Sequence, residues 1–427
     1  MERRTFILAS GVLASRAFGA NDRVNVAIVG VGSRGRDHVN SYLKVPGARL
    51  AALCDVDTAQ TERGSAMIEK ATGEKPKVYQ DLRKLYEDRS IDAVSIATPN
   101  HWHALATVWA CQAGKDVYCE KPASYNMFEG DQMVNAARKL NRIVQIGMQG
   151  RTQEHKRKAI QLLRDGVIGR IYMAKGICFK RRPSIGHTPV ETPPPGLNWD
   201  IFLGPAPMRP YTKNRFAYNW HWFWDTGNGD IGNQGIHEMD IARWGLGRGL
   251  PASAGSFGGK YLYDDDQETP NTQTASFDYG DAELVFEVRG LATGGEAAIT
   301  GTRQGFVGNI FLGDKGFMSM DDGGYRIFLG DRREPGESAV AEKGDDTARH
   351  MQNFLDAVKS RRYQDLHADV QEGVTSVYLV HMANISYRLA GRKLKFDAAT
   401  NSFVNDAEAN AMRTRSKYRE PYTFPKI

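Results

Sequence analysis

Lys121 is the residue of this 427-residue chain whose position most favours chemistry. It stands in the tripeptide Glu120-Lys121-Pro122, directly after the strand-like run Asp116-Val117-Tyr118-Cys119. A glycine motif, Gly30-x-Gly32-x-x-Gly35, occurs far upstream. In an open parallel sheet, ligands collect beyond the carboxyl ends of the strands, so a lysine just past a later strand can reach what binds at the first turn. We therefore expect Lys121 to meet a substrate and a nicotinamide together.

The glycine motif has the context of a dinucleotide-binding turn. A β-rich run precedes it at residues 24–29, and a helix is expected after it, over residues 34–43. The three glycines would permit a tight turn, the approach of a pyrophosphate to the backbone, and the packing of helix on strand. Ser33 and Arg34 stand where the helix N-terminus would face the phosphates.

An acidic residue, Asp55, ends the next strand-like run, residues 48–54. Its carboxylate would accept hydrogen bonds from the adenosine ribose and would repel a 2′-phosphate, so we expect NAD rather than NADP. The alternative is that Asp55 is only a turn residue at the end of a strand.

A third turn, Thr98-Pro99-Asn100-His101-Trp102-His103, follows the strand-like residues 93–97. Proline ends the strand, and the turn can offer backbone groups and the Asn100 amide to the cofactor. Alternatively, His101 and His103 only start and cap a helix. The predicted cofactor contacts are Gly30, Gly32, Ser33, Arg34, Gly35, Asp55, Thr98, Pro99, Asn100, His103, Glu120 and Lys121.

A second group of polar residues lies in the run from Gly227 to Trp244. Asn233 and His237 are four residues apart, hence on one face if this segment is one helix, and Asp240 follows three residues later. Histidine is the side chain most easily poised to take a hydroxyl proton near neutral pH. Without this context, His237 would more often be a buried structural histidine.

Four large aromatics and a histidine crowd the run from Tyr218 to Asp225. Aromatic faces can stack on a sugar while neighbouring polar groups bind its hydroxyls. A buried aromatic seam against the Pro-rich loop is the alternative. The predicted substrate contacts are Tyr218, His221, Trp222, Asp230, Asn233 and His237.

Alternating strand-like and helical segments predict βαβ units and a parallel sheet over residues 21–148. Residues 149–427 are expected to form a second domain rich in strands, with strand-like segments at 170–179, 282–288, 297–300 and 309–312. Two amphipathic helices near the end, residues 350–360 and 373–389, could pack back on the first domain.

The composition is that of an ordinary globular protein, 41% hydrophobic and 25% charged, and a net charge of +6 is too mild to indicate nucleic acid binding. The runs His155 to Lys158 and Lys180 to Arg182 are interpreted as solvated basic faces. The four cysteines show neither paired nor metal-like spacing, and no metal site is expected.

The N-terminus carries Arg3-Arg4 before a short apolar stretch, residues 6–14. This arrangement is typical of a twin-arginine export signal, so residues 1–20 are expected to be removed and the mature protein to be periplasmic. The alternative is a basic N-terminus on a cytoplasmic enzyme. No window approaches the ~20 apolar residues that span a bilayer.

In order along the chain, the glycine motif, Thr98-Pro99-Asn100-x-x-His103, Gly114-Lys115-x-Val117-x-Cys119-Glu120-Lys121-Pro122 and Gly235-x-His237-x-x-Asp240-x-Ala242-Arg243 resemble the Gfo/Idh/MocA oxidoreductase family. The resemblance covers nearly the whole mature chain. It implies a Rossmann domain followed by an α/β domain with a large open, mostly antiparallel sheet, through which members often form dimers or tetramers.

By this resemblance Lys121 and His237 are catalytic, and the chain has Asn233 where the family commonly has aspartate. Asparagine can position a hydroxyl but cannot relay a proton, so Asp230, His221 or Asp240 would have to compensate, or the chemistry differs. The segments 198–207 and 418–422 resemble an exported branch of the family.

Three hypotheses follow from these observations. The first is an NAD-dependent oxidoreductase that acts on a hydroxyl of a sugar, cyclitol or glycoside and holds its cofactor tightly. The second is a glycoside hydrolase or lyase that oxidises the sugar transiently and consumes no NAD. The third is a protein that binds NAD or sugar without catalysis.

Overall fold

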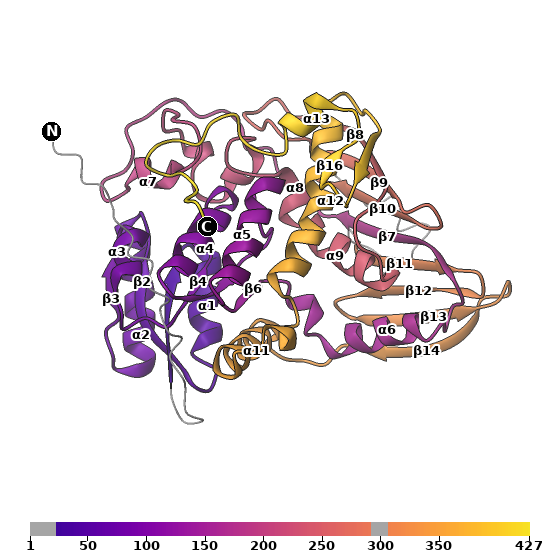
Figure 1. The fold of residues 1–427 in the computed structure, drawn as a ribbon, viewed down its shortest axis with the longest axis horizontal. Helices are drawn as coiled ribbons and strands as arrows, with labels where there is room; N and C mark the ends of the chain where they lie inside the picture. Colours follow the sequence, from indigo (N-terminus) through magenta and orange to yellow (C-terminus); the bar gives the residue numbers. More distant parts are fainter. Residues whose placement is uncertain (1–22, 292–305) are drawn as a thin grey trace.

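The computed structural model of the protein describes residues 23–291 and 306–427. The expected export signal at residues 1–20 and the strand-like segment 297–300 lie outside the described residues. Two sheets dominate the molecule, and helices cover them (Figure 1).

The first sheet is parallel and has six strands in the order β3-β2-β1-β4-β5-β6. This is the doubly wound arrangement that the alternation of segments predicted. Its central strands are buried on both faces, which is why they consist almost wholly of apolar residues. The strands are β1 (Val24–Val29), β2 (Ala48–Cys54), β3 (Lys77–Tyr79), β4 (Ala93–Ile96), β5 (Asp116–Cys119) and β6 (Val144–Ile146).

Helices connect these strands and cover the sheet. Asparagine or aspartate caps three of them: Asp57 and Asp81 each accept from the backbone two residues on, and Asn126 accepts from the N–H of Glu129. The helices are α1 (Ser33–Tyr42), α2 (Thr58–Thr72), α3 (Leu82–Glu87), α4 (Asn100–Gln112) and α5 (Met127–Lys139). A 3₁₀ turn (Gln149–Arg151) and α6 (Glu154–Arg164) lead to the second half of the chain.

The second sheet has ten strands in the order β14-β13-β12-β11-β7-β10-β9-β8-β15-β16. Every pairing is antiparallel except that of β10 with β7. The fold class expected from the sequence is therefore confirmed. The strands are β7 (Ile171–Phe179), β8 (Ser253–Gly259), β9 (Thr272–Asp278), β10 (Glu283–Arg289), β11 (Val307–Gly313), β12 (Gly316–Asp321), β13 (Gly324–Leu329), β14 (Glu334–Val340), β15 (Leu394–Asp397) and β16 (Ser402–Phe403).

Helices on one face of this sheet join it to the first. The remaining helices are α7 (Trp199–Leu203), α8 (Gly229–Asn233), α9 (Gly235–Leu246), α11 (Asp346–Ser360), α12 (Val370–Arg388) and α13 (Ala407–Ala411). α9 packs on β7 and α12 on β8, while α11 contacts α1 and α12 contacts α5 (Figure 1). α11 thus packs on the side of the first sheet and α12 bridges the two sheets, and both helices begin three or four residues before the expected positions.

Candidate functional site

The glycine turn after β1 has the geometry that its sequence predicted. Gly30 has φ +84°, and a Cβ there would lie 2.8 Å from the backbone of Ala97. A Cβ on Gly35 would lie 1.9 Å from the Gly30 carbonyl oxygen, whereas a Cβ on Gly32 would meet nothing within 4 Å. Gly30 and Gly35 are therefore required by the packing of the chain on itself, and Gly32 leaves open space for a ligand.

A cavity of about 590 Å³, here called the first cavity, runs from the carboxyl end of β2 past this turn to Lys121. Most predicted cofactor residues line it: Gly30, Gly32, Ser33, Arg34, Asp55, Thr98, Pro99, Asn100, His103, Glu120 and Lys121. Gly35 does not line the cavity, because it lies beneath Gly30. The sequence reasoning missed other lining residues, among them Arg36, Arg63, Gln80, Ile201, Phe202, Phe216 and Trp220.

Asp55 has two functions in the structure. Its carboxylate accepts hydrogen bonds from the backbone N–H of Val31, at 2.5 Å, and of Asp57, at 2.9 Å. Asp55 thereby holds the glycine turn against the end of β2, so it is more than a turn residue at the end of a strand. Burial raises the pKa of Asp55 to about 6. The same carboxyl also lines the first cavity, where a ribose hydroxyl could bind.

The first cavity suits a dinucleotide. The hydroxyl of Thr98 is buried in its wall and has no hydrogen-bond partner among the described residues. Buried hydroxyls are normally paired, so an unpaired one in a cavity wall fits a polar ligand. The uncapped N-terminus of α1 also lies at the cavity and leaves backbone N–H groups for a phosphate.

His101 and His103 support the local structure rather than offering free ring nitrogens. The His103 ring contacts the carbonyl oxygens of Pro122 at 2.7 Å and Thr98 at 2.8 Å. The His101 ring contacts the carbonyl oxygen of Phe202 at 2.8 Å. Both rings are fully buried, and burial lowers the pKa of each. His103 thus holds the loop after Lys121 against the turn after β4.

Glu120 is buried beside Lys121 and contacts three other side chains. Its carboxylate accepts hydrogen bonds from the Arg34 guanidinium at 2.7 Å and from the Gln149 amide at 3.3 Å, and it contacts the His38 ring at 3.0 Å. The Arg34 and His38 contacts hold the pKa of Glu120 below its ordinary value against the effect of burial. Glu120 therefore couples the N-terminus of α1 to the loop that carries Lys121.

The Lys121 ammonium lies where the first cavity meets the second half of the chain. Nζ donates a hydrogen bond of 2.7 Å to the backbone carbonyl of Asn233. Burial lowers the pKa of Lys121, while the Glu120 carboxylate opposes that shift. A half-buried ammonium with one fixed partner retains two donors, which can polarise a hydroxyl oxygen placed in the cavity.

Side chains from distant parts of the chain form a network next to Lys121. The Arg182 guanidinium binds the Asp230 carboxylate through two hydrogen bonds, of 2.8 and 3.1 Å. The Asn233 amide donates to the Tyr218 hydroxyl at 2.8 Å and to Asp230 at 3.3 Å. Tyr218 and Asn233 line the first cavity, whereas Asp230 lies behind them as their support.

The interpretation of Arg182 as part of a solvated face was wrong. Its side chain is 16% exposed because it pairs with the buried Asp230, while Lys180 and Arg181 are exposed as expected. The run at residues 155–158 needs the same correction, since His155 and Lys156 are buried. They point inward together with Ala159 and Ile160, and the helical spacing could have revealed this.

Asn233 and His237 do not share one helix. α8 ends at Asn233 and α9 begins at Gly235, so the chain breaks between them. Asn233 lines the first cavity, whereas His237 lines a second cavity of about 150 Å³. Burial, together with the Lys121 charge, lowers the pKa of His237 to about 3. The imidazole therefore lies within electrostatic reach of Lys121 but borders a different space from the one predicted.

The aromatic run contributes to the first cavity with other members than predicted. Tyr218 and His221 line it, together with Trp220, whose ring stacks on His221 at 3.6 Å between centroids. Trp222 is buried and does not line the cavity, so its predicted substrate contact is not supported. Some residues of the run therefore form a wall of the first cavity, and others, such as Trp222, are buried in the protein interior.

The Pro-rich segment, residues 180–216, is here called the strap, because it leaves the second sheet and crosses to the first. The backbone N–H of Asn198 donates to the Val56 carbonyl at 2.8 Å, and Gln80 donates to the Gly196 carbonyl at 2.9 Å. Ile201 and Phe202 of the strap line the first cavity. The strap therefore covers the cavity near the end of β2.

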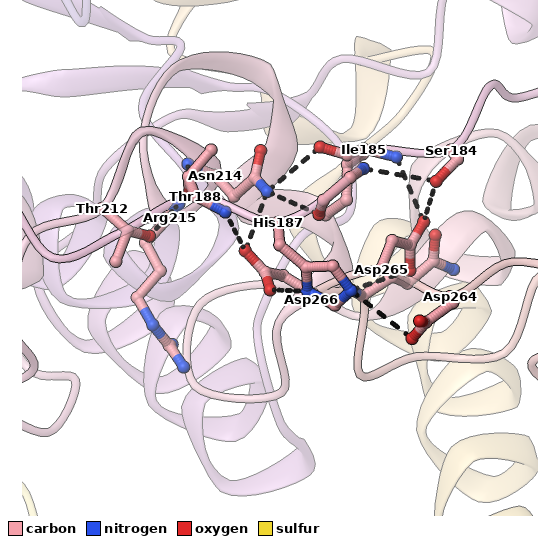
Figure 2. Close-up of polar contacts among 12 residues, drawn as sticks. Ser184, Ile185, His187, Thr188, Thr212, Asn214, Arg215, Asp264, Asp265 and Asp266 are labelled. Atoms are coloured by element: carbon pink, nitrogen blue, oxygen red, sulfur yellow. Dashed lines mark hydrogen bonds and ion pairs between the residues drawn. The ribbon is translucent and has the colours of Figure 1, made fainter.

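The start of the strap is fixed by a cluster of carboxylates (Figure 2). His187 lies between Asp264 and Asp266, with its ring 2.7 Å from the Asp266 carboxylate. The neighbouring Asp265 accepts from the Ser184 hydroxyl at 2.9 Å. The Asp266 carboxylate raises the pKa of His187.

The C-terminal tail holds the middle of the strap, at α7. Arg419 and Tyr422 bind Asp200 of α7, the tyrosine hydroxyl at 2.6 Å, and the Tyr422 ring meets Trp102 edge-on at 5.5 Å. In Figure 1 the tail lies beside α7 above α4. We call this contact the clasp. The clasp joins the segments 198–207 and 418–422, the two segments that resemble an exported branch of the family.

Comparisons with known proteins match both halves of the chain. The model of the oxidoreductase family with an NAD-binding Rossmann fold matches residues 24–148, and that of its C-terminal alpha/beta domain matches residues 173–252 and 317–424. The chain belongs to the Gfo/Idh/MocA oxidoreductase family. The resemblance drawn from the sequence motifs is thereby confirmed.

Relatives in this family differ in activity. A myo-inositol 2-dehydrogenase of Thermotoga maritima is 24% identical over 348 residues, covering 80% of this chain and 86% of its own length. A glycosyl hydrolase family 109 protein of Saccharopolyspora erythraea is 27% identical over 221 residues, covering 50% of this chain and 43% of its own length. The chain spans less than half the length of this and other early matches.

Solved structures share the fold. The WlbA dehydrogenase of Bordetella pertussis, in complex with NADH and UDP-GlcNAcA, superimposes with a TM-score of 0.64 at 19% identity. The match covers 88% of this chain and 99% of that one. Among the described residues, no helix is long and apolar enough to cross a membrane.

Proposed function

We propose that the protein oxidises a hydroxyl of a sugar, cyclitol or glycoside and transfers the hydride to NAD bound in the first cavity. The observation that carries this proposal is the position of Lys121, whose ammonium lies at the junction of the first cavity and the Tyr218–Asn233–Asp230 network. Hydroxyl, amide and ammonium donors gathered beside aromatic rings suit a polyhydroxylated substrate.

The residues have separate tasks in this reaction. NAD, when bound, supplies the acceptor for the hydride that leaves the substrate carbon. Lys121 donates a hydrogen bond to the reacting oxygen and stabilises the negative charge that develops there. His237 borders the second cavity and lies within electrostatic reach of Lys121, so it takes the hydroxyl proton through water rather than by direct contact. Asn233 and Tyr218 orient the substrate, and the Arg182–Asp230 pair fixes these two side chains.

Asp55 favours NAD over NADP in this proposal, because a second negative charge beside its carboxylate would be repelled. Arg36 and Arg63 also line the cavity and would reduce this discrimination. We propose tight retention of the cofactor, since the strap covers the cavity and is fixed by the clasp at Asp200.

The second candidate function is a glycoside hydrolase or lyase in which the sugar is oxidised, the aglycone is eliminated, and the hydride returns. A covered cofactor favours this function, since a reaction that regenerates NAD in place needs no exchange of cofactor. The family 109 relatives carry a glycosyl hydrolase name, which supports the same proposal.

Export and assembly also remain proposals. The twin-arginine motif supports a periplasmic enzyme that leaves the cytoplasm already loaded with NAD, and cell fractionation would test this. The open face of the ten-stranded sheet supports a homodimer or homotetramer, which light scattering would test.

The deciding experiment begins with mature protein purified without added cofactor. Denaturation and identification of any released nucleotide show whether NAD is retained. Absorbance in the NADH band is then followed as sugars and glycosides are added. Steady formation of NADH from added NAD supports a dehydrogenase, whereas a single reduction followed by reoxidation and release of aglycone supports the hydrolase. No response of the cofactor to any sugar or glycoside would contradict both.

A further inference from the structure

The second cavity is a polar space next to the proposed reaction centre. It holds about 150 Å³ between the start of α9, the 3₁₀ turn after β6, α6 and the turn between β12 and β13. Its lining is mostly polar and includes Gln149, Gln153, Lys156, His237, Glu238, Asn309 and Asp322. A polar space of this size has room for several water molecules.

His237 borders the second cavity. Its ring has no hydrogen-bond partner among the described residues, and it lines the second cavity rather than the first. On the other side, the amide of Asn233 cannot carry a proton, and Asp230 is engaged by Arg182. Asn233 stands four residues before His237, where the family commonly has aspartate, and the nearby Asp230 carboxylate is occupied by Arg182.

Glu238 supplies a carboxyl group on the cavity side. The residue is 6% exposed, and one of its oxygens, Oε2, is buried without a partner, while Oε1 accepts from the Gln234 amide at 3.3 Å. A buried carboxyl oxygen without a partner is rare and costs free energy. Because Glu238 lines the cavity, water there is the natural partner for Oε2.

The cavity also has a route to solvent. Lys156 and Asp322 form an ion pair of 2.6 Å in its lining, and the Asp322 side chain is 83% exposed. Asp321, the last residue of β12, also lines the second cavity and is partly exposed. A proton that reaches Glu238 can therefore leave by way of water and the Asp322 carboxylate without crossing the first cavity.

We propose that Glu238 accepts, through water in the second cavity, the proton that His237 takes from the substrate hydroxyl. The inference rests on the proposed function. The substrate C–H and O–H bonds would break and a C=O bond would form, with the hydride passing to NAD, which the residues of the first cavity would hold, and the proton passing through water to His237. The proton then passes by water to the Glu238 carboxylate and on to solvent. The substrate is oxidised and NAD is reduced, so atoms and electrons balance.

The charged and titratable groups around Glu238 define the expected pH dependence. Facing it or lining the same cavity are Lys156 of α6, Asp321 and Asp322 of the turn, Cys178 of β7, His237 and Asp240 of α9, and Arg151, which pairs with Asp240. Burial raises the pKa of Glu238 to about 8. Only the ionised carboxylate can accept a proton, so oxidation should become faster as the pH rises toward that value.

The test compares E238Q with the control E129Q, a buried glutamate away from both cavities whose pKa burial raises to about 7. The first readout needs neither sugar nor turnover. Histidine is labelled with ¹⁵N, the His237 signal is assigned by its loss in H237N, and the signal is followed with pH. We expect an inflection near pH 8 in the wild type and in E129Q, and none in E238Q.

The second readout is the rate of the first reduction of bound NAD. In the wild type and E129Q it should rise with pH up to about 8; in E238Q it should be about tenfold or more slower and lose this dependence. E238D or added formate should restore part of the rate.

A His237 signal with no inflection near pH 8 in the wild type, or with the same inflection in E238Q, would overturn the proposal. An E238Q enzyme with the wild-type rate and pH profile would do so too. Failure of every sugar to reduce NAD in the wild type, with the inflection present, would instead refute the proposed function.

Discussion

The two sides of Lys121 are built differently. On the cofactor side, the backbone makes the site: the glycine turn, the ends of β2 and β4, and the N-terminus of α1. On the substrate side, side chains far apart in sequence make it, such as Arg182 with Asp230 and Lys121 with the Asn233 carbonyl. The difference teaches that a fixed backbone can bind one common cofactor while exchange of side chains adapts the other side to different substrates.

The strongest test of this comparison is Lys121→Met, at the junction itself. Loss of the ammonium should slow the reduction of bound NAD by about 10³-fold, because charge on the reacting oxygen loses its partner. Stopped-flow absorbance gives the rate. Lys115→Met, at the opposite end of β5, removes a buried lysine that, among the described residues, donates to the carbonyls of Asp88 and Ile91 and to no side chain. This control variant should lower the free energy of unfolding but leave the rate of reduction of bound NAD unchanged.

Asp230→Asn tests whether the substrate side depends on side-chain pairing. It leaves the Arg182 guanidinium without its carboxylate in a mostly buried position and should cost about 3 kcal/mol in the free energy of unfolding. Urea denaturation measures the loss. The double variant Asp230→Asn/Arg182→Met should regain stability but not activity, and full activity in it would contradict the orienting role.

Two glycine substitutions test whether the backbone makes the cofactor side. Gly35→Ala places a Cβ 1.9 Å from the Gly30 carbonyl oxygen and should destabilise the fold by about 2 kcal/mol. Gly32→Ala meets no protein atom, so stability should stay the same while the affinity for NAD falls about tenfold. Thermal unfolding with and without NAD separates the two effects. If both variants lost stability, or both lost affinity for NAD, to the same extent, the separate roles of Gly35 and Gly32 would be contradicted.

Asp55 gives the cofactor side its pH dependence. Its pKa of about 6 means that a falling pH neutralises the carboxylate that would bind the ribose, so the affinity for NAD should decrease below that pH. In Asp55→Asn this dependence should vanish, and the preference for NAD over NADP should fall about tenfold. Calorimetric titrations at several pH values measure both.

His187 should give the smallest effect. Its raised pKa means that its contact with Asp266 stabilises the strap fully below the ordinary histidine pKa and is lost as the pH rises through the folded value. As the pH rises from about 6.5 through the raised pKa of His187, release of bound NAD should accelerate about twofold, a small effect because the His187 side chain is 60% exposed. The variant His187→Ala should release NAD at the faster rate at every pH. If its release rate still changed with pH as in the wild type, His187 would not be the group responsible.

The first sheet and its cofactor turns were predictable from the sequence because their signals are local. Apolar runs followed by glycine, aspartate or proline give β1, β2 and β4 and the turns after them. In the second half of the chain, the strands at residues 253–278 and 316–340 were not anticipated. These strands pair with their neighbours in sequence, β8 with β9 and β12 with β13, but several buried positions in β8 and β9 carry polar residues, such as Ser253, Ser256 and Gln273, which hides the apolar alternation.

The positions of side chains were less predictable. The spacing of Asn233 and His237 suggested one helical face, but the break at Gln234 sends them to different cavities. Arg182 lies in a basic run that is otherwise exposed, and only its contact with Asp230 distinguishes it. Trp222 and Trp220 are indistinguishable in the sequence, yet only Trp220 reaches the first cavity.

The sequence by itself determined the family, the parallel first sheet and the position of Lys121 after β5, because these depend on the local chain and on its hydrophobic pattern. Only the tertiary structure decided which side chains meet Lys121, that the strap and clasp cover the first cavity, and that His237 shares a cavity with Lys156 and Asp322. The physical reason is that such contacts join residues scores of positions apart, and no short-range pattern encodes where two distant side chains come together.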